Sequence, residues 1–201
     1  MQLIISSAWS LKQELKIVLL AFLLILSLPI AAVFMLTNAG IDIISSKLAT
    51  QNTQTNAVEI HDPKDGSVIA SVTNSMHWPI SGVVMLEFGA IDLPYQPLHT
   101  GIDIANNKDT PVTPFMDGTV TYASEIFWGY GKHIIIDNGN HITSLYAHLD
   151  NIYVYPGEKV TMNQVIGAEG ETGWATGPHL HFEIRIFGIP VNPRTFLAGN
   201  P

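Results

Sequence analysis

Two histidines separated by a single residue follow a Thr-Gly-Pro turn in the segment TGPHLHFEIR, residues 176–185. In an extended chain alternate side chains point to one face, so His179 and His181 would share a face. Glu183 and Arg185 would continue that face, and apolar residues would fill the other. The two imidazoles would lie about 7 Å apart, two residues at ~3.3 Å each. Imidazoles at that spacing can serve one reaction centre, although the pattern alone equally describes a solvated strand face.

A histidine and an aspartate four residues apart form the second candidate group, in LHTGIDIA at residues 98–105. A helix would also align His99 with Asp103, but Gly101 and the β-rich flanks favour an extended segment in which they share a face. Because Gly101 has no side chain, the space between imidazole and carboxylate would stay open for an ion. The alternative is that Asp103 caps a turn and His99 lies at the surface.

The third candidate is His148, which ends the β-rich run HITSLYAHL at residues 141–149. Strand alternation places it on one face with Ser144 and Tyr146. A single histidine at a strand end is usually a polar edge residue. Its significance therefore depends on the other two groups.

Together the three groups meet the requirements of a hydrolytic zinc site, which takes three protein ligands and leaves a fourth position for water. Two imidazoles and a carboxylate suit Zn²⁺. His99, Asp103 and one histidine of the 179/181 pair would supply them, and the remaining imidazoles could transfer protons or polarise a carbonyl. The chain has no cysteine, which excludes disulfides, thiolate ligands and a cysteine nucleophile. No HExxH or GxSxG motif occurs, so a helix-borne zinc site and a serine triad are unsupported.

In this order, HTGID, YAHL and TGPHLHFEIR resemble the motifs of the lysostaphin-type, LytM-like zinc metallopeptidases. The similarity extends from about Trp78 to Leu197 and includes the segments WPISG, PVTPFMDGTVTYA and GYGKHIIIDNGN. The three motifs together are far more specific than any one of them.

Carried over position by position, the resemblance implies that His99, Asp103 and His181 bind one zinc ion. It implies that His148 and His179 are the catalytic imidazoles. The family's fold, a compact antiparallel β domain with the metal in a long groove, agrees with the strand pattern.

Two further polar residues near this set have roles that the sequence leaves open. Glu183 shares the face of His181, where it could accept the outer N–H of a ligand imidazole, although a surface carboxylate is the commoner outcome. His133 would pair roughly opposite Ser144, on the face of His148. We expect it to be structural.

The elements that must position these residues are predicted to be short strands. Between 76 and 201, β-rich runs alternate with Gly, Pro and Asn turns, and no helix-period stretch of useful length follows residue 50. The Asn-Gly of NGN, residues 138–140, between two β-rich runs is a strong hairpin signal. The sequence therefore predicts an all-β peptidase domain at 76–201, antiparallel and barrel-like, preceded by a polar connector at 38–75.

The run IVLLAFLLILSLPIAAVFML, residues 17–36, has no charged side chain and is long enough to span a bilayer as a helix. A secretory signal usually has an apolar core of about 7–15 residues. We therefore expect one retained transmembrane anchor at 17–37. The small residues of TNA, 37–39, leave a cleaved signal as the alternative.

The charge distribution sets the expected orientation and limits the partners. Lys12 and Lys16 precede the apolar run and the next basic residue is Lys47, so residues 1–16 should be cytoplasmic and the peptidase domain extracytoplasmic. The formal net charge is −8, which argues against a nucleic-acid partner because such a partner favours a basic surface.

The resemblance thus implies a membrane-held endopeptidase that acts on bacterial cell-wall peptides. The alternative belongs to another class, since some relatives have lost metal ligands and activate other wall hydrolases without catalysis. Because all five family positions are kept here, an enzyme is the favoured prediction.

Overall fold

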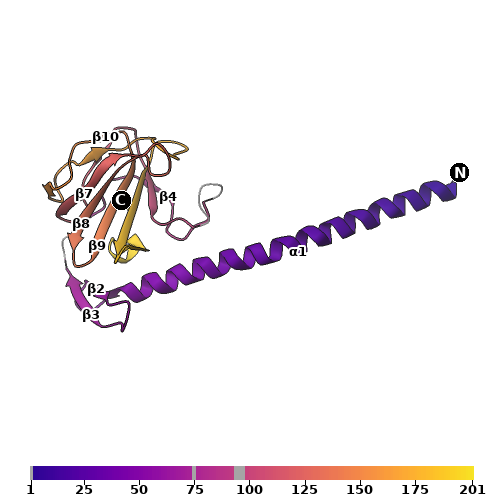
Figure 1. Ribbon diagram of the computed structural model, residues 1–201, viewed down its shortest axis with the longest axis horizontal. Coiled ribbons are helices and arrows are strands. Elements are labelled where there is room, and N and C mark those ends of the chain that lie inside the picture. The colour runs from indigo at the N-terminus through magenta and orange to yellow at the C-terminus, as the bar shows by residue number, and fades with distance from the viewer. Residues whose placement is uncertain (1, 74–75, 93–97) are drawn as a thin grey trace. The chain divides into compact units, whose positions relative to one another are not determined.

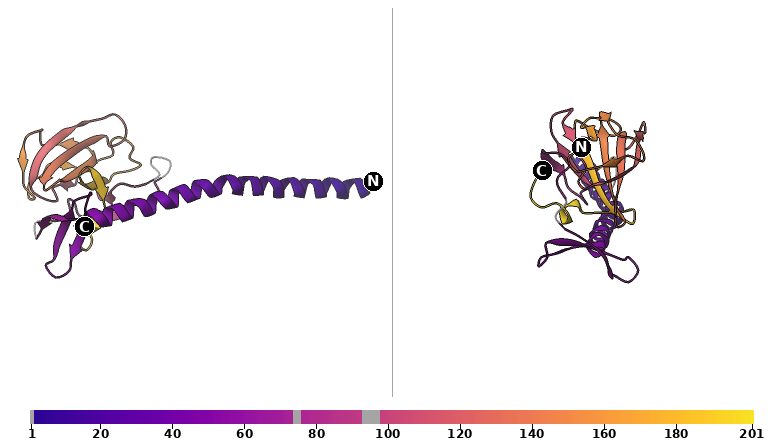
Figure 2. Two further views of the ribbon diagram at one scale, coloured as in Figure 1. Left: turned by 60° about the horizontal axis from the view of Figure 1, so that its bottom comes forward. Right: turned by 90° about the vertical axis from the view of Figure 1, so that its left-hand side faces the viewer.

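The computed structural model describes residues 2–73, 76–92 and 98–201 of the chain (Figure 1; Figure 2). Contacts divide the chain into two compact units, Met1–Ala39 and Gly40–Pro201. The second unit contains every strand and all five residues of the expected site.

Helix α1, Gln2–Leu48, makes up the first unit and reaches into the second. Its described side chains include exposed large apolar groups on all sides between Leu15 and Leu28. The expected span at 17–36 lies partly outside the described residues, because the side chains of residue 26 and of 29–36 are not included. Among the described residues, no helix is both long and apolar enough to cross a membrane.

Within the segment 38–75, which the sequence predicted to be a polar connector, residues 49–72 contain three strands. After α1, strands β1 (Ala49–Asn52), β2 (Ala57–His61) and β3 (Val68–Val72) form an antiparallel sheet in that order. The turn cluster before β3 is held by side-chain caps, since Asp62 and Asp65 accept from the backbone N–H groups of Lys64 and Ser67. Apolar side chains hidden among the polar residues of this segment join the hydrophobic core: Leu48, Ala49, Val58, Ile60 and Val72. Residues 48–72 therefore contribute to the core of the second compact unit.

The largest sheet has the strand order β11-β7-β8-β9-β13-β5-β4, with β14 paired to β13. Its strands are β4 (Val83–Leu86), β5 (Ile102–Ala105), β7 (Gly118–Glu125), β8 (Lys132–Gly139), β9 (Ile142–Leu149), β11 (Lys159–Val160), β13 (Leu180–Ile186) and β14 (Ile189–Val191). A smaller sheet contains β10 (Asn151–Ile152), β12 (Gly167–Ala168) and β6 (Pro111–Val112), and a 3₁₀ helix, η1 (Pro193–Thr195), lies near the C-terminus. All the strand pairings found among the described residues of these two sheets are antiparallel, which confirms the predicted mainly antiparallel β fold.

The predicted hairpin is formed by β8 and β9, although its turn lies slightly later than expected. Asn140 and His141 have φ of 51° and 63°, as a two-residue turn of the primed type requires. Asn138 and Gly139 instead belong to the end of β8.

Strand β13 lies between β9 and β5 in the middle of the sheet. Its apolar face, predicted from the alternation, is fully buried at Leu180, Phe182, Ile184 and Ile186. The other face is buried as well, because His181 and Glu183 are 3% and 0% exposed. The polar side chains of a central strand therefore need partners inside the protein.

Candidate active site

Strand register brings the separated motifs together. In the antiparallel pairing of β13 with β5, His181 lies directly opposite Asp103, and on the other side His181 lies opposite Ala147, one residue before His148. The segment around Asp103 is extended, as predicted.

The sequence suggested that Gly101 leaves space for an ion, but the structure requires glycine at this position for close packing. A Cβ there would overlap the carbonyl oxygen of Phe182 and lie 3.0 Å from Cε1 of His181. The missing side chain therefore admits the backbone of β13 and the His181 ring, not an ion.

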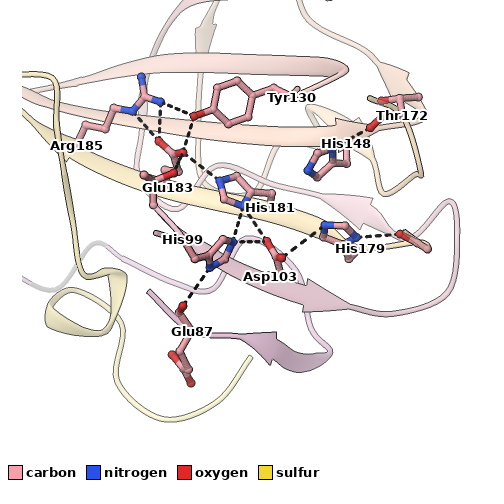
Figure 3. A network of polar contacts seen from close by, with 12 residues as sticks. Glu87, His99, Asp103, Tyr130, His148, Thr172, His179, His181, Glu183 and Arg185 are labelled. Atoms are coloured by element: carbon pink, nitrogen blue, oxygen red, sulfur yellow. Dashed lines mark hydrogen bonds and ion pairs between the residues drawn. The ribbon is translucent and has the colours of Figure 1, made fainter. Parts of the chain in front are cut away.

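Two imidazole nitrogen atoms and one carboxylate oxygen atom converge at the centre of this arrangement (Figure 3). Nε2 of His99 lies 3.0 Å from Oδ1 of Asp103 and 3.0 Å from Nδ1 of His181. Nδ1 of His181 lies 2.7 Å from the same Oδ1. His99, Asp103 and His181 are the one group of possible metal ligands found among the described residues.

In His99 and His181, the ring nitrogen that points away from Asp103 already has a hydrogen-bond partner. That partner determines whether the other ring nitrogen carries a proton or a lone pair. Nδ1 of His99 donates to the carbonyl oxygen of Glu87 at 3.1 Å, and Nε2 of His181 donates to Oε1 of Glu183 at 3.0 Å. These tautomers, assigned from their partners, leave two imidazole lone pairs and a carboxylate oxygen facing one another. Three acceptors this close repel unless a cation lies between them. Tetrahedral bonds of ~2.0–2.1 Å would separate the ligand atoms by ~3.3 Å, so a small outward shift fits the group to a metal ion.

The pKa values of the metal-free site also favour a positive charge among these three groups. Burial acts to lower the pKa of His181, but its hydrogen bonds with Asp103 and Glu183 outweigh burial and raise the pKa to about 9. Burial acts to raise the pKa of Asp103, and the hydrogen bonds from His181 and His99 hold it far below its usual value instead. Without a metal ion, a proton on His181 therefore supplies the positive charge between the three groups.

Glu183 is the hub of a buried network behind His181 and is not a surface carboxylate. Its Oε1 accepts from Thr100 Oγ1 at 2.6 Å and from the Tyr130 hydroxyl at 2.8 Å, besides His181. Its Oε2 accepts from Nε of Arg185 at 2.6 Å. Burial acts to raise the Glu183 pKa, but His181 and Arg185 lower it to about 2. A fixed carboxylate therefore orients the His181 imidazole, whereas a surface carboxylate was the commoner expectation from the sequence.

His148 and His179 form a second pair of imidazoles beside the ligands, with ring centroids 4.7 Å apart. Nδ1 of His148 donates to the Thr172 carbonyl and Nδ1 of His179 to the Gly177 carbonyl, each at 2.8 Å. Both therefore keep a lone pair on Nε2, and Nε2 of His179 lies 3.7 Å from Oδ2 of Asp103. Both rings line the same pocket as His99, Asp103 and His181.

The backbone of His148 is unusual for a strand residue, with φ of 62°. Such a conformation costs about 1–3 kcal/mol and persists where the surroundings impose it, commonly at functional sites. Here the His148 N–H donates to the Tyr130 carbonyl at 2.9 Å. Burial, followed by the charges of His181 and His179, lowers the pKa of His148 to about 3. The buried ring is thus held as a neutral acceptor in the metal-free protein.

Several aromatic residues that belong to none of the sequence motifs also line the pocket. Trp128 and Tyr130 come from the connection between β7 and β8, and Trp174 comes from the loop before β13. The available signal was the run FWGYGK, in which aromatic residues stand among glycines in a turn.

His133 is buried away from the described pocket lining, as expected of a residue with a structural role, but its partner across the hairpin differs from the prediction. Ile136, not His133, lies opposite Ser144. The His133 ring is buried and stacks on Tyr122, with ring centroids 4.4 Å apart. His133 is not among the described residues that line the pocket.

Comparison with known proteins covers the segment that holds this site. Residues 97–193 match the family model described as "Peptidase family M23", and all five site residues fall within that range. Among curated proteins, "DD-carboxypeptidase/endopeptidase Mpg" of Neisseria meningitidis serogroup B is 47% identical over 104 residues, 52% of this chain and 24% of that protein. "Murein hydrolase activator NlpD" of Escherichia coli K12 is 38% identical over 124 residues, 62% of this chain and 31% of that protein. The chain thus spans about a quarter to a third of the length of these relatives.

Solved structures with the same fold include one described as a catalytic domain and one described as a zinc-containing peptidase. A mutant of the catalytic domain of the prophage-encoded M23 protein EnpA from Enterococcus faecalis is 32% identical, with a TM-score of 0.54. The match covers 62% of this chain and 98% of that domain. A zinc-containing peptidase from Vibrio cholerae is 26% identical with a TM-score of 0.57, over 74% of this chain and 48% of that one.

Proposed function

This chain belongs to peptidase family M23, and from this premise we propose that it is a zinc endopeptidase that hydrolyses peptide bonds in bacterial cell-wall peptidoglycan. The observation that carries the proposal is the convergence of three lone pairs from His99, Asp103 and His181. Two further imidazoles, whose Nδ1 atoms are held by backbone carbonyls, line the same pocket. A metal site with adjacent acid–base groups is what hydrolysis of an amide requires.

The chain's own residues would divide the remaining chemistry. Zinc held by His99, Asp103 and His181 would supply Lewis-acid polarisation and a lowered pKa for the attacking water. The Nε2 atoms of His148 and His179 can take a proton from that water and return it to the leaving amine. Once protonated, either imidazole can donate a hydrogen bond to the developing oxyanion. Their Nδ1–H groups stay bound to backbone carbonyls throughout, so the rings need not reorient.

A second candidate function comes from the relatives named as murein hydrolase activators, one of them 38% identical. In that case the domain would bind cell-wall material or a partner hydrolase without cutting a bond. The intact ligand set and the two spare imidazoles favour the enzyme, because an activator needs neither a metal site nor a base beside it.

We also propose that the N-terminal helix holds the catalytic unit at the outer face of a membrane. Support comes from the uncharged run at 17–36 and from ten exposed large apolar side chains between Leu15 and Leu28, which would be unfavourable in water. Lys12 and Lys16 before the run favour a cytoplasmic N-terminus.

The test is digestion of purified peptidoglycan of known cross-bridge chemistry by the full chain in detergent, with product masses measured. An enzyme releases new amino and carboxyl ends, and a chelator stops their release until zinc is restored. An activator produces no new ends alone and accelerates an added wall hydrolase; that result would refute the enzyme proposal.

A further inference from the structure

Two tryptophans form one wall of the pocket that holds the metal ligands. Trp128 and Trp174 have ring centroids 6.1 Å apart with planes inclined at 48°, and they are 58% and 50% exposed. Both indoles line the pocket together with His99 and Asp103. Aromatic side chains gathered in the lining of a pocket are typical of ligand-binding sites.

The two loops that carry these indoles are fastened to each other. The Trp174 N–H donates to the Gly129 carbonyl at 2.8 Å, and the Lys132 N–H donates to Oγ1 of Thr172 at 2.9 Å. Gly131 and Gly173 adopt φ of 62° and 70°, and a Cβ on either would overlap the opposite loop. The aromatic wall is therefore held in place before a ligand arrives, which lowers the entropy cost of binding.

The charge around this wall favours a cationic occupant. Asp92 lines the same pocket, and no lysine or arginine is among the described residues that line it. Asp103 faces the proposed metal ion, so Asp92 is the carboxylate of the pocket lining that is left for a cationic group of the substrate. Tryptophan is the aromatic side chain that binds cations best through its ring face, and aromatic rings arranged as a cage can bind an ammonium group.

We propose that Trp128, Trp174 and Asp92 form a subsite for the side-chain ammonium group of a diamino acid in the substrate peptide. This inference rests on the proposed function, because it takes the pocket to bind a peptide of the cell wall. The alkyl stem of such a side chain would pack on the indoles while its charged end faces the ring faces and the carboxylate. A neutral sugar or an aliphatic side chain would use the apolar area but would leave Asp92 without a partner of opposite charge.

The test uses one cross-linked peptide fragment of cell wall in three forms. Its free side-chain amine is left unchanged, reductively dimethylated so that the positive charge is kept, or acetylated so that the charge is lost. Binding of each form to the zinc-loaded full chain carrying His148→Ala is measured by calorimetry, so that no bond is cut during the titration.

The variants Trp128→Leu and Trp174→Leu keep apolar area and remove the ring face. Each should weaken binding of the two charged forms by about two- to fivefold and should change binding of the acetylated form much less. Phe127→Leu is the matched control, because Phe127 is 93% exposed beside Trp128 and is not among the pocket-lining residues. It should leave all three affinities unchanged. Asp92→Asn should reduce the preference for the charged forms.

Three results would overturn the subsite: equal weakening for all three forms, no preference for charge in the parent protein, or no effect of either tryptophan. Equal weakening would indicate a neutral occupant such as a sugar ring. The proposed function is tested separately by cleavage. If the protein cuts no bond but shows a charge preference that depends on Trp128, the enzyme proposal is refuted and the subsite stands. If it cuts bonds without any charge preference, the subsite is refuted and the enzyme proposal stands.

Discussion

Replacing Glu183 with Gln tests whether the network behind His181 builds the metal site. The carboxylate accepts from His181, Thr100 and Tyr130 on one oxygen and from Arg185 on the other. A glutamine has nearly the same shape, but its NH₂ group can only donate. Whichever way the amide is turned, NH₂ faces either the guanidinium or the three donors on the other side.

Two magnitudes follow from the geometry. Loss of a partner that orients a ligand imidazole typically weakens metal affinity by about 10–100-fold. Removing one member of a buried ion pair costs about 3–5 kcal/mol. Because the Arg185 side chain is 25% exposed, water relieves part of that cost, and we expect the free energy of unfolding to fall by about 2–3 kcal/mol.

The assay is competition for zinc against a chelator of known affinity, with urea unfolding of the same preparations. Glu87→Gln is the matched control, since its side chain pairs with Arg194 at the surface and only its backbone carbonyl holds His99. The control should keep its zinc affinity and lose less than about 1 kcal/mol of stability. If Glu183→Gln binds zinc as tightly as the parent, the carboxylate does not orient His181 in the way argued.

Three further predictions concern stability and location. A fragment of residues 76–201 should unfold at lower urea concentration than one of 40–201, because it lacks four large core side chains, Leu48, Val58, Ile60 and Val72, each worth up to about 1.5–3 kcal/mol; equal midpoints would show that the first sheet is dispensable. Gly101→Ala should yield little folded protein or lose several kcal/mol, as its Cβ would overlap the backbone at Phe182; a parent-like denaturation curve would contradict the close approach seen there. Residues 17–36 should remain in the mature, membrane-fractionating protein, and N-terminal sequencing that begins shortly after the run would show a cleaved signal instead.

The pairing of site residues could be anticipated from sequence because strand alternation is a local property. The two-residue period placed His181, Glu183 and Arg185 on one face, and these side chains indeed form a continuous chain of hydrogen bonds. The antiparallel fold was likewise predicted from β-rich runs and turn residues. The buried state of Glu183 was not, since it depends on Thr100 and Tyr130, which are distant in sequence.

Other features required knowledge of tertiary packing. Gly101 suggested an open space for an ion, whereas the space is filled by a neighbouring strand whose identity the sequence does not show. Residues 38–75 appeared polar, because the few apolar side chains that join the core are diluted by Thr, Asn and Gln. The tryptophan wall depends on two loops more than 40 residues apart meeting at Gly131 and Gly173.

The most direct test of the central claim measures bound zinc and wall-peptide cleavage on His181→Ala, His179→Ala and His148→Ala. His181→Ala removes one of three convergent ligands, so zinc and activity should both be lost. His179→Ala and His148→Ala leave the ligands in place, so zinc should stay while turnover falls by about 10²–10⁴-fold. Loss of zinc from His179→Ala with retention by His181→Ala would reverse the ligand assignment. Retention of zinc and activity by all three variants would contradict the account.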